Sequence, residues 1–211
     1  MESGTALLSP SWSGDRDLQL QPGRITEVAG FPGMGMTRLG LGLLVEPSRR
    51  SMVVALDVKG WLSPLAAWEM GIDASRFVVI RCPEAGKWAQ VAAALVEGVR
   101  AVYAEVPAGV SSRHLHRLAA LARARRSGVV LRVTEEELPP GVAHLTLRAT
   151  GVRWEGVDRG HGQLRRRLLA VEASGKGVAG ITRRIEMVDD GTDVMRVVSG
   201  VGAQGERAAT G

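Results

Sequence analysis

Cysteine and histidine are scarce in this chain, which has one cysteine and four histidines among its 211 residues. A single cysteine, Cys82, cannot form a disulfide within the chain. His114 and His116 are two residues apart on a predicted helix, so their side chains point in different directions and do not share a metal ion. We therefore expect neither an internal disulfide nor a structural metal site.

Long apolar segments are missing as well. No run approaches the roughly 20 apolar residues that a membrane-spanning helix needs. The opening segment MESGTALLSPSWSGDRD has no basic stretch followed by an apolar one, which a secretory signal would show. We expect a cytosolic protein with no membrane partner.

Aromatic residues make up only 4% of the chain. Trp61, Trp68, Trp88 and Trp154 are scattered, without the close spacing of a platform on which bases stack. Most of them should be packing residues. Trp154, beside a basic segment, is the candidate for exposure.

Basic charge is concentrated in one segment. The formal net charge is +5, yet residues 148–184 hold nine lysines and arginines against three acidic residues. In the densest cluster, Arg165 to Arg167, strand geometry would point Arg166 away from its two neighbours. The cluster fits either a charged edge strand that resists aggregation or a surface that contacts nucleic acid or an acidic partner. The candidate contact residues are Arg153, Trp154, Arg165, Arg166, Arg167 and Lys176.

Apolar strand patterns alternate with helical patterns over more than half of the chain. The predicted strands are 25–29, 51–58, 77–81, 101–106 and 129–133, and the predicted helices follow residue 37 and cover 63–71, 84–98 and 111–128. Buried strands that alternate with helices indicate a mostly parallel sheet covered on both faces. A chain of this length with 45% apolar residues should form one main domain with appendages.

The helical pattern stops after the loop TEEELPPG. HLTLRA, VRWEGV, LRRRLLAVEA and RRIEMV are typical of short antiparallel strands that extend the sheet. We divide the chain into a flexible arm at 1–20, which ends in a short strand near Leu18 and Leu20, a core at 21–135, a basic β extension at 136–190 and a disordered tail at 191–211.

Two further patterns have plain structural explanations. SGKG at 174–177 lacks the upstream glycine of a phosphate loop and falls between strand-like runs, so it predicts a hairpin turn. Four arginines surround the apolar stripe of one predicted helix and should form a solvent face, with a DNA-binding surface as the alternative. They are Arg113, Arg117, Arg123 and Arg125.

The segment GFPGMGMT at 30–37 has the spacing of a phosphate-binding loop, G-x-x-x-x-G-K-[ST], except that Met36 replaces the lysine. Such a loop binds phosphate through backbone N–H groups, the lysine and magnesium held by Ser or Thr. Losing the lysine removes a charge-assisted interaction of about 1.5–3 kcal/mol, and hydrolysis should suffer more than binding. The alternative is a glycine-rich turn with no ligand. The candidate nucleotide-binding residues in this segment are Gly30, Gly33, Gly35, Met36 and Thr37.

Residues 22–134 resemble the core of the bacterial recombinase RecA. GRITEVAGFPGMGMTRLGLGLL is similar to its first strand, phosphate loop and helix, VVALDVKGWLSPLAAWEMGID to its next strand and helix, and AVYAEVPAG to its Walker B strand. The resemblance implies that Lys59 replaces the glutamate that activates water and that Glu105 replaces the Walker B aspartate. It therefore adds Glu105 as the sixth candidate nucleotide-binding residue. A protonated lysine cannot act as that base, because neutrality near pH 7 needs a pKa lowered by roughly 3 units. We therefore expect no catalytic residues, no ATP hydrolysis and no cofactor, with weak ATP and magnesium binding as the alternative.

A narrower resemblance is to degenerate RecA-like proteins of the ImuA type. It rests on RWEGVDRGHGQLRRRLLAVEASGKGVAG, AGKWAQVAAALVEGVRAV and HRLAALARARRSG. It implies an α/β fold with a RecA-like P-loop core, a mostly parallel sheet flanked by helices and a C-terminal antiparallel β extension.

The same resemblance implies a non-catalytic accessory of SOS-induced translesion synthesis. Its partners would be a Y-family polymerase homologue of the ImuB type and the error-prone polymerase III alpha subunit. The alternatives are a nucleotide-binding switch or weak ATPase, a RecA-like DNA-binding repair protein and, more distantly, a SulA-like inhibitor of cell division.

Overall fold

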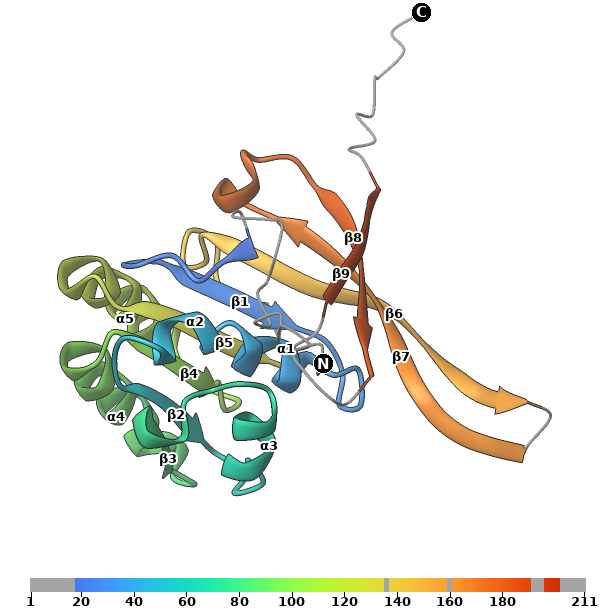
Figure 1. Cartoon of the computed structure of the whole chain (residues 1–211). Helices are drawn as coiled ribbons and strands as arrows, with labels where there is room; N and C mark the ends of the chain where they lie inside the picture. The colour runs from blue at the N-terminus through green and yellow to red at the C-terminus, as the bar shows by residue number, and fades with distance from the viewer. Residues whose placement is uncertain (1–17, 135–136, 159–160, 191–195, 202–211) are drawn as a thin grey trace, which may run out of the picture.

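One sheet dominates the computed structural model, which describes residues 18–134, 137–158, 161–190 and 196–201. Within these ranges, nine strands pair in the order β3-β2-β4-β5-β1-β6-β7-β8-β9. The pairs from β3 to β6 are parallel and those from β6 to β9 are antiparallel (Figure 1). The predicted α/β class, with a mostly parallel sheet and an antiparallel C-terminal extension, is confirmed.

The parallel strands are short and largely buried. They are β1 (Ile25–Ala29), β2 (Val53–Asp57), β3 (Phe77–Arg81), β4 (Ala101–Glu105) and β5 (Gly128–Val133). All positions of β1, β2, β4 and β5 are buried, whereas β3 at the edge is partly exposed. Nearly continuous apolar runs form these strands because both faces of a parallel sheet are covered.

Helices cover the two faces of the parallel part. On one face, α1 (Met36–Gly42), α2 (Val45–Ser48) and α3 (Pro64–Glu69) pack through residues such as Leu39 and Ala67. On the other face lie α4 (Ala85–Gly98) and α5 (Ser112–Arg125), whose buried stripes include Trp88 and Leu118. A 3₁₀ turn, η2 (Ala74–Arg76), leads into β3. The sheet therefore separates two apolar clusters.

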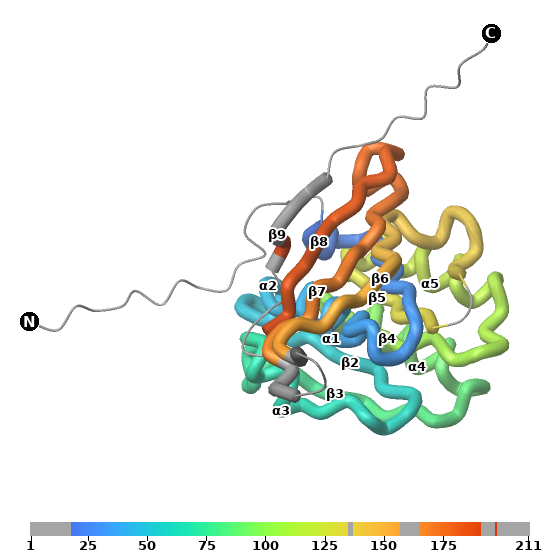
Figure 2. The backbone as a smooth tube through the Cα atoms, turned by 90° about the vertical axis from the view of Figure 1, so that its right-hand side faces the viewer, coloured from blue at the N-terminus to red at the C-terminus, as the bar shows by residue number. Residues whose placement is uncertain are grey.

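The antiparallel part is built from longer strands. These are β6 (Leu145–Asp158), β7 (His161–Ser174), β8 (Arg183–Asp189) and β9 (Arg196–Val201), with a 3₁₀ turn, η3 (Lys176–Val178), between β7 and β8. The SGKG segment thus lies in the connection between two antiparallel strands, as predicted. In Figure 2, β6, β7 and β8 run side by side.

Three strand predictions are wrong. HLTLRA and VRWEGV form one strand, β6, and its first residues pair parallel to β1, because the chain enters β6 at the edge where β1 begins. There the His144 N–H donates to the Ile25 carbonyl at 2.8 Å. Leu18 and Leu20 lie in no strand, although Leu18 is buried. Residues 196–201, expected in the disordered tail, form β9 against β8. The rest of the predicted arm (1–17) and tail (191–195 and 202–211) lies outside the described residues.

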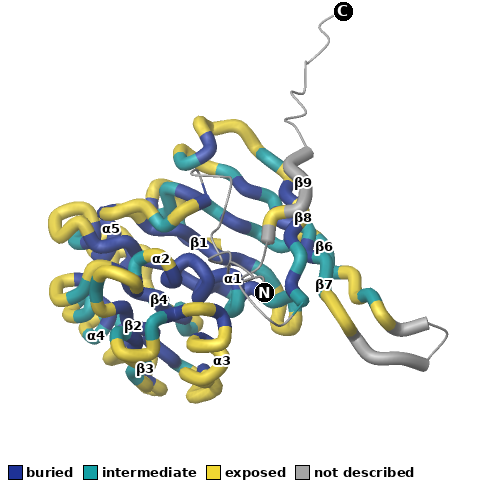
Figure 3. Tube along the Cα trace, in the orientation of Figure 1, coloured by how far each residue is buried: buried dark blue, intermediate teal, exposed yellow. Residues whose placement is uncertain are grey.

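The β6–β7 hairpin extends away from the body of the molecule. Figure 3 shows buried positions concentrated in the body, while the outer described part of the hairpin is half-buried or exposed. Within the described residues, no helix is both long and apolar enough to cross a membrane.

Candidate functional site

The glycine-rich loop connects β1 to α1, as the sequence predicts. Gly30, Gly33 and Gly35 have φ values of 152°, 85° and 77°, a region that side chains other than glycine rarely adopt. The Leu39 N–H donates to the Gly35 carbonyl at 3.0 Å, which starts the helix directly after the loop. The loop therefore has the strand–loop–helix setting that its spacing predicts.

Met36, at the lysine position of the pattern, is 1% exposed. Its side chain packs in the same apolar cluster as Leu39 and Val28. A Cβ added to Gly30 would lie 3.0 Å from its Cγ, so the methionine lies directly against the start of the loop. In this position the side chain contributes to the core.

An arginine from the antiparallel part reaches the loop. Arg167 of β7 donates through Nη1 to the Gly33 carbonyl at 3.2 Å. A Cβ on Gly35 would come within 2.5 Å of the guanidinium carbon, so only a glycine leaves room for this contact. A cation of the chain itself thus lies against the turn where a phosphate loop would hold its anion.

An acidic residue holds Arg167 in place. The Asp189 carboxylate, at the end of β8, accepts a hydrogen bond from Nη2 of Arg167 and lies 3.0 Å from Nε of Arg38 in α1. The Asp189 side chain is 6% exposed. Since buried ions are retained only when paired, these groups form a joint between α1, β7 and β8.

A second arginine lies beneath the loop. Arg132 of β5 is buried and donates to the carbonyls of Val28, Gly30 and Val133, with 2.6 Å to that of Gly30. Burial lowers the pKa of Arg132, and the neighbouring Tyr103 and Glu105 oppose this shift. Burial also raises the pKa of Tyr103, with a further contribution from the Glu105 charge. Through its hydrogen bonds to the carbonyls of Val28 and Gly30, Arg132 holds the backbone that leads into the loop.

The turn after β2 uses its acidic residues to bind backbone. Asp57 is fully buried and accepts from the N–H groups of Gly60 at 2.8 Å and Leu62 at 3.0 Å. Glu105 accepts from the Trp61 indole N–H at 3.0 Å and from the Val58 N–H at 3.4 Å.

Lys59 lies in the same turn. Its Nζ is 4.5 Å from the centroid of the Trp61 ring. Lys59 and Glu105, which the resemblance to RecA places at ATPase positions, thus both contact Trp61 of this turn.

A cavity of about 550 Å³ lies between the loop and this turn. Five of the six predicted nucleotide-binding residues line it, and the sixth, Gly30, accepts a hydrogen bond from Arg132. The five are Gly33, Gly35, Met36, Thr37 and Glu105. The structure therefore brings the predicted residues together. Within the described residues, no group of three or more His, Cys, Asp or Glu side chains could hold a metal ion.

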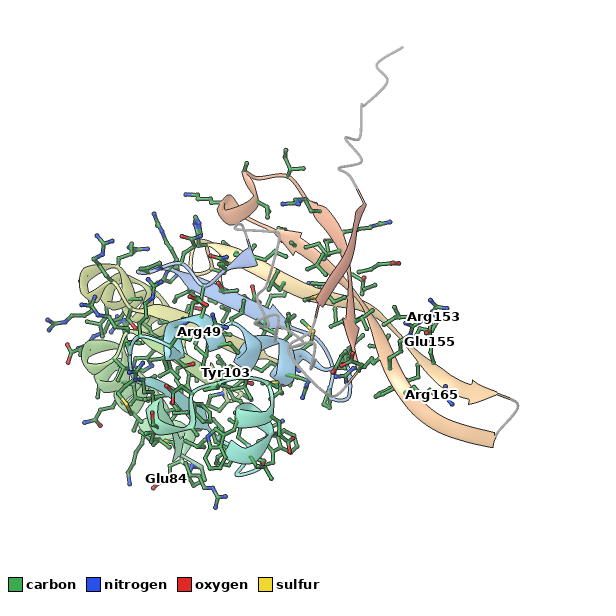
Figure 4. The ribbon with its side chains drawn as sticks, in the orientation of Figure 1. Arg49, Glu84, Tyr103, Arg153, Glu155 and Arg165 are labelled. Atoms are coloured by element: carbon green, nitrogen blue, oxygen red, sulfur yellow. The ribbon has the colours of Figure 1, made fainter. Side chains whose placement is uncertain are left out.

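The predicted contact residues divide into two groups. Trp154 is opposite Arg167 in the β6–β7 register, with 5.2 Å from its ring to the guanidinium carbon. Arg166 is opposite Glu155 on the next pair and forms an ion pair with it, so it points away from Arg167 as alternation predicts. Figure 4 labels Arg153 and Arg165 on the same arm. Lys176 lies elsewhere, beside a cavity lined also by Arg24 and Arg123.

Sequence reasoning missed the charged residues that shape the site. They are Arg38, Asp57, Arg132 and Asp189. A charge inside an apolar strand, as in VVLRV, is a signal that a buried partner exists. Nothing in the sequence marks Asp189 as the partner of Arg38 and Arg167, because the three come from distant segments.

The fold and loop define an α/β protein with a glycine-rich loop after its first strand. The chain belongs to the family of the MT3502 N-terminal domain, whose model matches residues 16–139. The match covers the elements from β1 to β5 and is to this family, not to RecA. No curated protein matches the chain.

Proposed function

We propose that this protein is a non-catalytic adaptor that retains the shape of a phosphate loop and acts through protein contacts. The observation that carries the proposal is Arg167, which contacts Gly33 and Gly35 while Asp189 holds it in place. A nucleotide phosphate would have to displace or share this paired arginine. Separating a buried ion pair costs several kcal/mol, on the order of 3–5 when one partner is left alone.

The other groups needed for hydrolysis are also engaged. Glu105 accepts two hydrogen bonds, and Lys59 places a cation beside Trp61 where the resemblance to RecA puts a general base. General-base assistance is worth about 10²–10⁴-fold in rate. These arrangements support the loss of hydrolysis.

The partners follow from the resemblance to the ImuA type. On this proposal the chain acts in SOS-induced translesion synthesis and binds a Y-family polymerase homologue of the ImuB type and the error-prone polymerase III alpha subunit. The contact surface is the outer β6–β7 arm, where the Arg153 side chain is 73% exposed and Arg165 is exposed. Trp154, which shares a face of the arm with Arg167, adds an exposed apolar group, as protein interfaces favour.

The test reverses charge on this arm without touching the joint. Arg153→Glu with Arg165→Glu should abolish co-purification with the ImuB-type homologue, while the thermal midpoint stays near that of the wild type. Arg167 is left intact because it is bound to Asp189. Arg113→Glu with Arg117→Glu, two exposed arginines of α5, is the matched control and should bind normally. Unchanged binding by the arm variant would refute the assignment of the surface.

A nucleotide-binding switch is the second candidate function, because a cavity of about 550 Å³ lies beside the loop. Calorimetry with ATP and magnesium separates the two functions. We expect weak or absent binding, and a submicromolar dissociation constant would make the switch the better proposal.

A further inference from the structure

A second cavity lies at the opposite edge of the sheet from the loop. It measures about 500 Å³, within the size range of ligand pockets. Its lining includes Arg50, Arg100 and Arg126, which come from segments widely separated in sequence. The arginine-rich segment 148–184 contributes none of them.

The topology explains why these arginines meet. Arg100 directly precedes β4, while Arg50 and Arg126 lie just before β2 and β5. Because β2, β4 and β5 are adjacent and parallel, their amino ends share one edge, with neighbouring strands about 4.8 Å apart. The three cations therefore form a row along that edge, near Arg49, which Figure 4 labels.

The part of the chain that the structure describes does not neutralise the charges in this row. Among the described residues, none of the three guanidinium groups forms an ion pair, and all three residues are exposed. The acidic residue that lines the cavity, Glu46, is already paired with Arg49 at 3.1 Å. Like charges that line one cavity repel one another, and an anionic ligand would relieve the repulsion.

The backbone conformation of Arg126 is a second observation that points to a role for its side chain at the cavity. It follows α5 with φ of 55°, the left-handed conformation that usually selects glycine at the end of a helix. For a residue with a side chain this conformation costs about 1–2 kcal/mol. The chain thus has an arginine beside the cavity at a position where glycine would adopt the backbone conformation at a lower cost in free energy.

The cavity between the arginines has apolar walls from Leu20, Leu43, Val45 and Pro47, beside the polar residues Gln19, Glu46 and Ser51. Within the described residues, no aromatic side chain lines it on which a base could stack. A nucleic-acid backbone would satisfy the arginines but leave these apolar walls uncovered. Arginine pairs with carboxylates through two parallel hydrogen bonds.

We propose that this edge, defined by Arg50, Arg100, Arg126 and the apolar cavity between them, binds an acidic segment of a partner protein in which apolar side chains alternate with carboxylates. The apolar side chains enter the cavity and the carboxylates pair with the arginines. This surface is separate from the β6–β7 arm, so the inference goes beyond the adaptor proposal.

Fluorescence anisotropy of labelled peptides tests the inference. The probe is a short peptide in which leucine alternates with glutamate. Its comparators alternate serine with glutamate, or leucine with glutamine, and a labelled oligonucleotide of equal charge completes the set. The leucine–glutamate peptide should bind at least ~10-fold more tightly than each comparator, because the serine–glutamate peptide lacks the apolar contacts and the leucine–glutamine peptide lacks the charge-assisted hydrogen bonds.

The variant Arg50→Gln, Arg100→Gln, Arg126→Gly should weaken binding of that peptide by ~100-fold or more. The control removes three arginines elsewhere, Arg81→Gln, Arg113→Gln and Arg117→Gln, and should bind within ~3-fold of the wild type. Arg126→Gly alone should bind more weakly and unfold at the same or a higher temperature, which separates lost binding from lost folding.

Three results would overturn the inference. Equal binding of the serine–glutamate peptide would show that the cavity is not used. Tighter binding of the oligonucleotide would assign the edge to nucleic acid. Full binding by the triple variant would place the peptide elsewhere on the protein.

Discussion

The parallel and antiparallel parts of the sheet differ in how their strands are covered. In the parallel part, α1–α3 and α4–α5 cover opposite faces, and whole strands such as β1 and β4 are buried. In the antiparallel part, β8 alternates between buried and more exposed positions, and the outer β6–β7 arm has little cover. The apolar cluster on the α1 face continues into the antiparallel part through Leu169, Ile185 and Met187, so the two parts differ in cover: the parallel part has helices on both faces, whereas the outer arm is partly exposed. A charged joint adds a further link between the two parts.

That joint consists of Arg38, Arg167 and Asp189. It ties α1 of the parallel part to β7 and β8 of the antiparallel part, beside the glycine-rich loop. We therefore expect substitutions at the joint and in the covered parallel part to lower the free energy of unfolding strongly. Substitutions on the arm should lower it only slightly.

The largest loss is expected from Asp189→Ala. Removing this carboxylate leaves two largely buried arginines without their shared partner, which should cost about 3–5 kcal/mol of the free energy of unfolding. Urea denaturation measures the loss. Glu155→Gln, which removes an acid paired with Arg153 and Arg166 on the arm, is the control and should cost less than ~1 kcal/mol. Equal losses would mean that the joint has no special role.

The next largest effect concerns Met36→Lys, the change that restores the loop pattern. Because Met36 is buried, the new ammonium group would have to lose its water, and we expect a loss of about 3 kcal/mol near pH 7. The loss should shrink as the pH rises towards the pKa of free lysine, since the neutral amine is cheaper to bury.

Met52→Lys is the control for this substitution, because Met52 is 43% exposed and should accept the charge without measurable loss. A Met36→Lys variant as stable as the wild type would show that the new side chain reaches the cavity. The expectation from the loop pattern, tighter nucleotide binding, would then apply.

A smaller effect is expected from Gly40→Ala in α1. A Cβ at this position would lie 2.7 Å from Cε2 of the buried Tyr103, so α1 and β4 would have to move apart. Overpacking of this kind costs about 1–3 kcal/mol. Gly86→Ala in α4, where an added Cβ meets nothing within 4 Å, should instead stabilise by about 0.5–1 kcal/mol. Thermal unfolding of both variants checks the difference in sign.

The smallest effect is expected from Trp154→Ala on the arm. Trp154 is 49% exposed, and its contact with Arg167 should contribute only about 0.5–1 kcal/mol. Trp88→Ala, in the cluster beneath α4, should cost about 3–5 kcal/mol. If chemical denaturation gives similar losses for the two tryptophans, the arm is part of the core and the comparison fails.

The sequence predicts the covered part well because local pattern and burial agree there. The apolar runs at 53–57 and 101–105 are strands, and the stripe of Leu115, Leu118 and Ala122 is the buried face of α5. The glycine spacing at 30–37 also predicts the loop and four residues that line its cavity, Gly33, Gly35, Met36 and Thr37.

What the sequence could not predict depends on pairing between distant segments. The parallel pairing of β6 with β1 and the contact of Arg167 with the loop have no local signal. Summing charge along the chain places the basicity in 148–184, yet Arg50, Arg100 and Arg126 meet only because their strands are neighbours.

The central place of β1 sets the order in which the protein can fold during synthesis. Ile25 pairs with Val129, and Thr26 pairs with Leu145, so the first strand made waits for partners roughly a hundred residues later in the chain. At about 5–20 residues per second, a ribosome needs on the order of 5–25 s to supply them. Until then β1, whose five positions are all buried in the finished fold, lacks the neighbours that cover it, and so does its glycine-rich loop.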